Sequence, residues 1–324
     1  EGIDRKFPFL LWFDSFDPHD PFDPPSIWEG YPNPYDPEYK GKRMFQPPQG
    51  SAHLYTEEQL NHMRMNYAEK ITMVDKWIGK LINKIKLLGL WDNSMVILTS
   101  DHGHPTGHGE HGHGIVRKCR PWPYEELAHI PMLIRVPGMR EGQRNASFIQ
   151  SVDIAPTIMD YISAKEGKAE YGKHVLDDDI SQSDIQGESL LPIIYGEKEK
   201  VRDFAIAGYY GYSWSIIRED YSYIHWIRKQ DAENLKEVVE MVSIMYDAEV
   251  GKGAGRGAGE KATTAQTEEM WSCTPGEVVL PEGDELYDRQ KDPFQLDNII
   301  VQNPAIAKEL LQQLKMHMAQ LRAT

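Results

Sequence analysis

The segment Met95-Val96-Ile97-Leu98-Thr99-Ser100-Asp101-His102-Gly103 joins a short apolar run to a polar loop. A run that is apolar throughout, rather than alternating, is typical of a strand covered on both faces, as in a parallel sheet. In open α/β sheets, ligands bind beyond the carboxyl ends of the strands. The sequence therefore predicts that Asp101 and His102 lie at a functional edge of a sheet.

The residues around this strand complete a strand–helix–strand pattern. A second apolar run, Phe7 to Phe13, predicts the first strand, and residues 131–136 predict the third. Thr56 to Gln59 form a capping box at the start of a long helix that Gly89 ends. The apolar face of that helix is predicted to contain Leu60, Met63, Tyr67, Ile71, Val74, Ile78, Leu81, Ile85 and Leu88. This order indicates an α/β fold, with a mixed or parallel sheet flanked by helices.

The pattern changes after about residue 200. Ser213 to Arg218 and Tyr221 to Arg228 alternate in polarity around Glu219-Asp220, which predicts a hairpin. Asn303-Pro304 predicts the start of a last helix. We therefore expect residues 1–200 to belong to an α/β catalytic domain and residues 201–324 to form a smaller α+β subdomain. A glycine-rich stretch at 251–269 predicts a flexible loop within the subdomain.

Composition excludes several classes of protein. The 324 residues are 40% hydrophobic, which argues against a wholly disordered chain. The 50 acidic and 35 basic residues give a net charge of -15, which argues against a general nucleic-acid binder. A local group of cations still allows a small anion to bind. No apolar run approaches the roughly 18–20 residues of a membrane span. Two cysteines allow one disulfide at most, and neither compartment nor oligomeric state follows from the sequence.

Asp101 and His102 are the first candidates for chemistry. A carboxylate and an imidazole are both ligands of divalent cations. Five histidines (His102, His104, His108, His111 and His113) lie between Asp101 and Gly114. No zinc-protease or zinc-finger spacing accompanies them. The sequence favours a metal or catalytic site over the alternative, in which Asp101 only caps a turn.

His19 and Lys118 are the second pair of candidates. His19 stands between Pro18 and Pro21, which restrict the backbone around an imidazole that can bind an anionic oxygen or protonate a leaving group. Lys118 follows the histidine-rich loop and offers a point charge to a phosphate or sulfate oxygen. Arg117 and Arg120 flank Lys118, so the sequence leaves open which cation faces the site.

These segments together resemble the sulfatase family of the alkaline-phosphatase-like superfamily. The matching segments are Pro8-Phe9-Leu10-Leu11, Asp17-Pro18-His19-Asp20-Pro21, Tyr67 to Gly79, Thr99 to Gly103, Gly109 to Gly112, Lys118, Ile130 to Ile134, Asp153 to Ile158, Glu285 to Asp288, Asp292-Pro293 and Asn298. They occur in family order over most of the chain, and the resemblance weakens in residues 26–50, 162–200 and 230–280. It implies an alkaline-phosphatase-like fold whose small subdomain contains a four-stranded antiparallel sheet and a helix.

The resemblance also implies roles for residues. In that family a formylglycine attacks sulfur, and a divalent cation, usually calcium, holds the nucleophile and a sulfate oxygen. By resemblance, Asp101 and His102 are metal ligands, His19 and Lys118 bind the sulfate and help the leaving oxygen depart, and His111 assists. Many sulfatases have asparagine where His102 stands, and an imidazole suits manganese, zinc or iron better than calcium. Manganese and zinc therefore stay open beside calcium.

One departure from the family concerns the nucleophile. The family forms it from Cys or Ser in a Cys/Ser-x-Pro/Ala-x-Arg motif, which precedes the region matched here, as does the first pair of metal-binding aspartates. Cys119 and Cys273 are each followed by proline at the third position but lack arginine at the fifth. We therefore expect a fragment of a sulfatase, lacking the N-terminal nucleophile segment and inactive in isolation.

The substrate class stays open at this point. The family implies sulfate esters, including those of carbohydrates, and members are typically periplasmic, secreted or lysosomal. The alternatives are a metal-dependent phosphonate monoester or phosphodiester hydrolase of the same superfamily, and a catalytically inactive binding module. Candidates to line a sugar subsite are Trp12, Trp28, Tyr31, Trp122 and Tyr124, although core packing is the more natural role for Trp12.

Overall fold

The computed structural model describes residues 8–45, 50–117, 122–139, 142–165, 186–209, 213–227 and 281–323. Contacts divide the chain into two compact units. The first comprises residues 1–48 and 52–92, and the second comprises residues 49–51 and 93–324. Lys118, Cys119, Cys273 and the glycine-rich stretch 251–269 lie outside the described residues. Within those residues, no helix has both the length and the apolar character that crossing a membrane requires.

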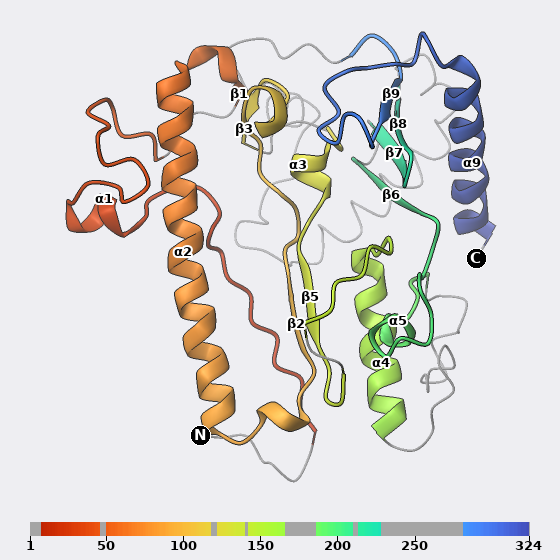
Figure 1. The fold of residues 1–324 in the computed structure, drawn as a ribbon, viewed down its shortest axis with the longest axis horizontal. Helices are drawn as coiled ribbons and strands as arrows, with labels where there is room; N and C mark the ends of the chain where they lie inside the picture. The colour runs from red at the N-terminus through yellow and green to blue at the C-terminus, as the bar shows by residue number, and fades with distance from the viewer. Residues whose placement is uncertain are drawn as a thin grey trace, which may run out of the picture. The chain divides into compact units, whose positions relative to one another are not determined.

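The first unit is built on helix α2 (Glu57–Leu87), the long orange helix of Figure 1. Gln59 N donates to Thr56 Oγ1 at 3.2 Å, and Thr56 N donates to Gln59 Oε1 at 3.0 Å, so the predicted capping box is confirmed. Gly89 follows the helix with φ +66° and donates its N–H to Lys86 O, which confirms the predicted end. The short helix α1 (Pro25–Glu29) and the 3₁₀ turn η1 (Ala52–Leu54) precede α2 in the chain. The 3₁₀ turn η2 (Trp91–Asn93) follows α2.

The buried face of α2 differs from the predicted one. Leu60 and Met63 are buried as expected, but the next buried positions are polar: Asn66, Glu69 and Lys70. Further along, the predicted core position Ile71 is exposed, as is Leu87 at the end of the helix. The helix packs on a polar, proline-rich loop, and polar side chains therefore occupy the face that periodicity assigned to apolar ones.

The predicted first strand is not formed. Residues 8–13 belong to no strand, and their apolar side chains are exposed, with Trp12 at 76%. A buried strand needs a partner for its backbone groups and cover on both faces. No described strand pairs with residues 8–13. The predictions of a buried strand here and of a core role for Trp12 are therefore wrong in this structure.

The second unit contains the other two predicted strands. They are β2 (Val96–Thr99) and β5 (Met132–Arg135), paired antiparallel with Thr99 opposite Met132. The pair is antiparallel and half-buried, so a purely parallel, fully covered sheet is wrong for these strands. The smaller elements are β1 (Gly50–Ser51), β3 (Thr106–Gly107), η3 (Gly109–His111), β4 (Ile115–Val116), α3 (Glu125–Ala128), η4 (Ser151–Asp153), α4 (Ile154–Lys165) and α5 (Leu191–Ile194).

The C-terminal part of this unit is the predicted antiparallel sheet with a helix (Figure 1). Its strands run in the order β6 (Phe204–Tyr209), β7 (Ser213–Arg218), β8 (Tyr221–Trp226) and β9 (Glu285–Asp288). Helix α9 (Pro304–Ala323) packs Leu310 and Leu314 against Ile216 and Leu286 of the sheet. The predicted hairpin and last helix are confirmed. The domain boundary near residue 200 stays a prediction, although the sheet does begin just after it.

Candidate functional site

The loop after β2 carries Asp101, His102 and Gly103 in close contact with α3. Gly103 N donates to Leu127 O at 2.8 Å, and a Cβ atom on Gly103 would lie 2.0 Å from Glu126 O. Only glycine allows the two backbones to approach so closely. The approach fixes the residue that directly follows the candidate metal ligands.

Replacing Gly103 with alanine is therefore expected to destabilise the second unit. Displacing a packed backbone by an added methyl group typically costs about 1–3 kcal/mol. Gly79→Ala is the matched control, because a Cβ atom at this position of helix α2 would meet nothing within 4 Å and alanine favours a helix. Denaturant unfolding should give opposite changes for the two variants. Equal changes would contradict the role given to the Gly103 contact.

Asp101 and His102, the candidate metal ligands, lie side by side in the loop after β2. His102 Nδ1 donates to Gly103 O at 2.7 Å, and His102 Nε2 lies 3.3 Å from Asp101 Oδ2. Donation from one ring nitrogen to a backbone carbonyl is the usual way in which a metal-ligating histidine is oriented. The Asp101 side chain is 81% exposed, so its carboxylate is accessible. The donor set fits a divalent cation, and within the described residues no third Asp, Glu, His or Cys joins the pair.

His111 and Lys118 remain candidates whose roles the structure does not test. His111 lies in η3, about half exposed, with Nε2 3.7 Å from Glu110 Oε1. Its backbone N–H donates to His108 O. Lys118 lies just beyond Arg117, the last described residue of this loop.

His113 is one of the five histidines of this loop, and the sequence analysis gave it no role of its own. Its Nδ1 lies 2.8 Å from Glu126 Oε1, and its Nε2 donates to Gln295 O at 2.8 Å. The ring stacks on Tyr124, with 3.6 Å between centroids. His113 therefore ties the histidine-rich loop to α3 and to the segment after β9.

The strength of these His113 contacts depends on pH, because it depends on whether the imidazole is protonated. Burial lowers the pKa of His113, but the hydrogen bond and charge of Glu126, the Gln295 carbonyl and the charge of Glu285 outweigh it, so the pKa is raised. The carboxyl of Glu285 is itself buried, and burial raises its pKa. A raised pKa means that the folded state holds the His113 proton more tightly than the unfolded state.

The stabilisation from His113 is thus complete below its unfolded pKa of about 6.5 and disappears as pH rises through the folded pKa. We expect the free energy of unfolding to fall over that range and His113→Gln to flatten the fall. His129, whose pKa is raised by a hydrogen bond to Glu125, acts in the same direction but is mostly exposed. Denaturant titrations from about pH 5.5 to about pH 9 on the wild type, His113→Gln and His129→Gln measure how much each histidine contributes to the pH dependence of the free energy of unfolding. An unchanged pH slope in His113→Gln would contradict the assignment.

His19 lies in the first unit, in the loop between two Asp–Pro bonds that are both cis. Its backbone N–H donates to Phe16 O at 3.0 Å, and its Nδ1 donates to Asp20 O at 2.5 Å. The Phe16 ring lies 4.4 Å away, centroid to centroid, and the imidazole is 25% exposed. With Nδ1 used, Nε2 accepts a hydrogen bond when neutral and donates one when protonated, as an anion-binding or proton-donating role requires.

The structure separates the aromatic candidates for a sugar subsite. Trp122 and Tyr124 are buried in the core with Trp226, so they do not line a subsite. Trp28 is 64% exposed, with Nε1 donating to Asp23. Tyr31 is also partly exposed and donates its hydroxyl to Glu69. Of the predicted set, Trp12, Trp28 and Tyr31 keep the accessibility that sugar stacking requires.

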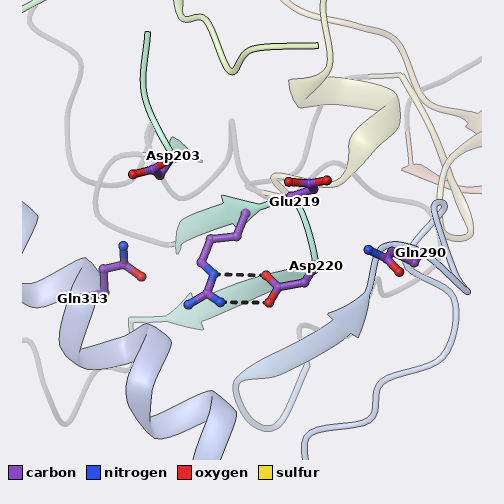
Figure 2. A pocket seen from close by; sticks show the side chains of 6 residues that line it. Asp203, Glu219, Asp220, Gln290 and Gln313 are labelled. Carbon is purple, nitrogen blue, oxygen red and sulfur yellow. Dashed lines mark hydrogen bonds and ion pairs between the residues drawn. The ribbon is translucent and has the colours of Figure 1, made fainter. Parts of the chain in front are cut away.

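A polar hollow in the second unit lies apart from the predicted residues. Figure 2 shows Asp203, Glu219, Asp220, Gln290 and Gln313 around it. Arg218 also lines it, but Asp220 binds this guanidinium twice, at 3.0 and 2.8 Å, and Glu309 binds it once, at 2.7 Å. The remaining carboxylates make this hollow unsuited to an anionic substrate.

Asp101 and His102 are neighbours in sequence and lie in contact, and their role as metal ligands stays a prediction. The convergence of His19 with this pair stays a prediction, because His19 belongs to the first unit and the pair to the second.

Comparison with known proteins adds two family models and several relatives. The model described as "Sulfatase" matches residues 3–164, and that described as "N-sulphoglucosamine sulphohydrolase, C-terminal" matches residues 109–248. An N-acetylglucosamine-6-O-sulfatase of Bacteroides thetaiotaomicron is 29% identical over 203 residues, which are 58% of this chain and 33% of the relative.

Two solved structures have the same fold, each with a TM-score of 0.55, 23% identity and coverage of 84% of this chain and 44% of the other. One is described as a complex with its substrate D-glucosamine-2-N,6-O-disulfate, and the other is a phosphonate monoester hydrolase of Agrobacterium radiobacter. These matches confirm the predicted alkaline-phosphatase-like α/β fold. The chain spans less than half the length of each of these relatives.

Proposed function

Because this chain belongs to the sulfatase family, we propose that it is part of a hydrolase that cleaves sulfate esters, with sulfated carbohydrates as the substrate class. The observation that carries the proposal is the oriented Asp101–His102 pair directly after β2, within the region matched by the family model. The similarity to an N-acetylglucosamine-6-O-sulfatase supports a carbohydrate substrate.

In this proposal Asp101 and His102 hold a divalent cation, with calcium first and manganese or zinc as alternatives. Such a cation supplies positive charge to a sulfate oxygen and orients the ester. The Nδ1–H bond to Gly103 O keeps Nε2 of His102 toward the carboxylate of Asp101, so the two donors are pre-arranged. The nucleophile, a formylglycine by resemblance, lies outside this chain.

His19 and Lys118 bind the anionic group in this proposal. His19 Nε2, when protonated, donates to the ester oxygen and passes it a proton as the bond to sulfur breaks. Lys118 adds a point charge, and His111 assists. Trp28 and Tyr31 offer exposed ring faces on which a sugar ring stacks.

A second candidate is hydrolysis of a phosphonate monoester or phosphodiester. The phosphonate monoester hydrolase matches this chain with the same TM-score as the sulfated-sugar complex. An imidazole ligand at His102 suits manganese or zinc better than calcium, and this observation favours keeping the candidate.

The test uses the full-length gene product that contains this chain. After treatment with a chelator, aryl sulfate and aryl phosphodiester hydrolysis are measured with added Ca²⁺ or Mn²⁺. We expect metal-dependent turnover of the sulfate that exceeds turnover of the diester, and a large loss in Asp101→Asn. Asp75→Asn, an exposed position on α2, is the matched control and should keep the activity. Greater diester turnover would select the second candidate, and no turnover of either substrate would indicate an inactive binding module.

A further inference from the structure

Helix α2 carries a buried lysine that contacts the His19 loop (residues 16–23) four times. Lys70 is 2% exposed. Its Nζ lies 2.7 Å from Asp17 Oδ1, 3.0 Å from His19 O, 2.6 Å from Pro21 O and 2.8 Å from Asp23 Oδ1. The contacts fall on alternate residues, so one ammonium group holds the whole length of the loop.

A buried cation is costly unless it is paired and hydrogen-bonded. Two carboxylates and two carbonyls surround the Lys70 ammonium, which has three protons to share among them. An apolar side chain would serve helix packing at less cost. The contacts that this lysine makes are therefore explained by the loop that it holds rather than by packing of the helix.

The four contacts of the Lys70 ammonium, which we call the clamp, include the candidate catalytic residue itself. The carbonyl of His19 is itself one of the four acceptors, so the ammonium fixes the backbone at His19. The Nδ1 bond to Asp20 O and the Phe16 ring then orient the imidazole on that backbone. Without the ammonium, Asp17 and Asp23 would repel each other across the loop.

We propose that Lys70 is a positioning residue, which holds the His19 loop so that the imidazole meets the oxygen of a sulfate ester in one orientation. This inference rests on the proposed function of His19. Lys70 itself does not touch the substrate.

The neighbouring residue provides a matched comparison. Glu69 is buried and accepts hydrogen bonds from Ser26 N at 3.0 Å, Ser26 Oγ at 2.5 Å and Tyr31 OH at 3.1 Å. It therefore holds residues 26–31, the next segment of the same loop region. Glu69→Gln loosens that segment while leaving the contacts of Lys70 in place.

The first test observes the imidazole itself, by NMR of ¹³C-labelled histidine in the 324-residue chain. The nearby Phe16 ring shifts the His19 ring protons, and loss of the signal in His19→Gln assigns it. We expect Lys70→Met to move this signal to its random-coil position. The signal of His62, which stacks on Tyr39 and lies on the same helix, should stay in place.

Two controls define the outcome of this first test. Lys76→Met, at an exposed lysine of the same helix, and Glu69→Gln should both leave the His19 signal unchanged. If Lys70→Met does not fold, Asp23→Asn removes one of the two carboxylates and should move the His19 signal part of the way. An unmoved His19 signal in a folded Lys70→Met protein would overturn the proposal, as would equal movement of the His62 signal.

The second test measures catalysis in the full-length gene product. Lys70→Met should slow aryl sulfate hydrolysis about tenfold to a hundredfold, because a small misplacement of a catalytic group has effects of that order. In a His19→Ala background the same change should have little further effect. An equal loss in both backgrounds would overturn the positioning role. Absence of sulfatase activity would count against the proposed function alone, because the NMR test addresses the clamp independently.

Discussion

His19→Ala in the full-length gene product is expected to slow sulfate-ester hydrolysis about 10²–10³-fold, the usual loss for a contact to charge that develops in the transition state. The imidazole is partly exposed, held by Asp20 and Phe16, and keeps Nε2 for the substrate. The measurement is kcat and KM for a series of aryl sulfates. If His19 protonates the leaving oxygen, the loss in kcat should grow as the pKa of the leaving phenol rises. Lys118→Ala should cause a loss of similar size that depends less on the leaving group.

The matched control for this prediction is His129→Ala. His129 is an exposed histidine whose only role in the described contacts is with Glu125. The His129→Ala enzyme should hydrolyse every aryl sulfate of the series at nearly the wild-type rate. A His19→Ala enzyme with wild-type kcat would remove His19 from the proposed anion site, and a loss equal for all leaving groups would limit it to binding.

The sequence predicts those parts of the fold that depend on neighbouring residues. The capping box at Thr56, the Glu219-Asp220 hairpin and the helix after Asn303 each involve groups a few residues apart, and all three are confirmed. The predicted strand at residues 7–13 depends on partners distant in sequence, and no described strand supplies them. Apolar character alone identifies a segment that needs cover, but not whether cover is present.

The same distinction applies to the site. Asp101 and His102 are adjacent in sequence, so their proximity follows from it directly. The contact from Lys70 to His19 spans 51 residues, and that from His113 to Gln295 spans 182 residues. One signal for Lys70 was present: it lies three residues after Tyr67 and seven after Met63, on the face predicted to be apolar. A lysine at such a position indicates a buried partner of opposite charge.

Several of the described lysine and arginine side chains form ion pairs that hold parts of the structure together. Lys70 is bound by Asp17 and Asp23, Arg218 by Asp220 and Glu309, and Arg289 by Glu125. The chain has a net charge of -15, and lysines and arginines that are already paired with carboxylates are not available to bind an anionic substrate. Other positively charged groups must therefore bind it. This is a physical reason for expecting a bound cation at Asp101 and His102 in addition to His19 and Lys118.

Breaking a fourth ion pair, between Asp153 and Arg202, has the largest expected effect on stability. Asp153 is fully buried at the end of η4, directly before α4, and both its oxygens accept from Arg202, each at 2.5 Å. The carboxylate also accepts from Gln150 N at 2.7 Å and Glu188 N at 2.9 Å. Asp153→Ala leaves the guanidinium of Arg202 and two backbone donors without their acceptor. Loss of one partner of a buried pair typically costs about 3–5 kcal/mol.

Denaturant unfolding of the second unit tests this expectation, with Asp203→Ala as the control. Asp203 pairs with Lys200, but both side chains are mostly exposed, and water replaces such a contact at little cost. Asp153→Asn keeps the shape of the side chain and one acceptor oxygen, so it should fall between the control and Asp153→Ala. This order separates the charge of Asp153 from its hydrogen bonds to backbone. Equal midpoints for Asp153→Ala and Asp203→Ala would show that the Asp153–Arg202 pair does not hold η4 and the strand region after residue 200 together.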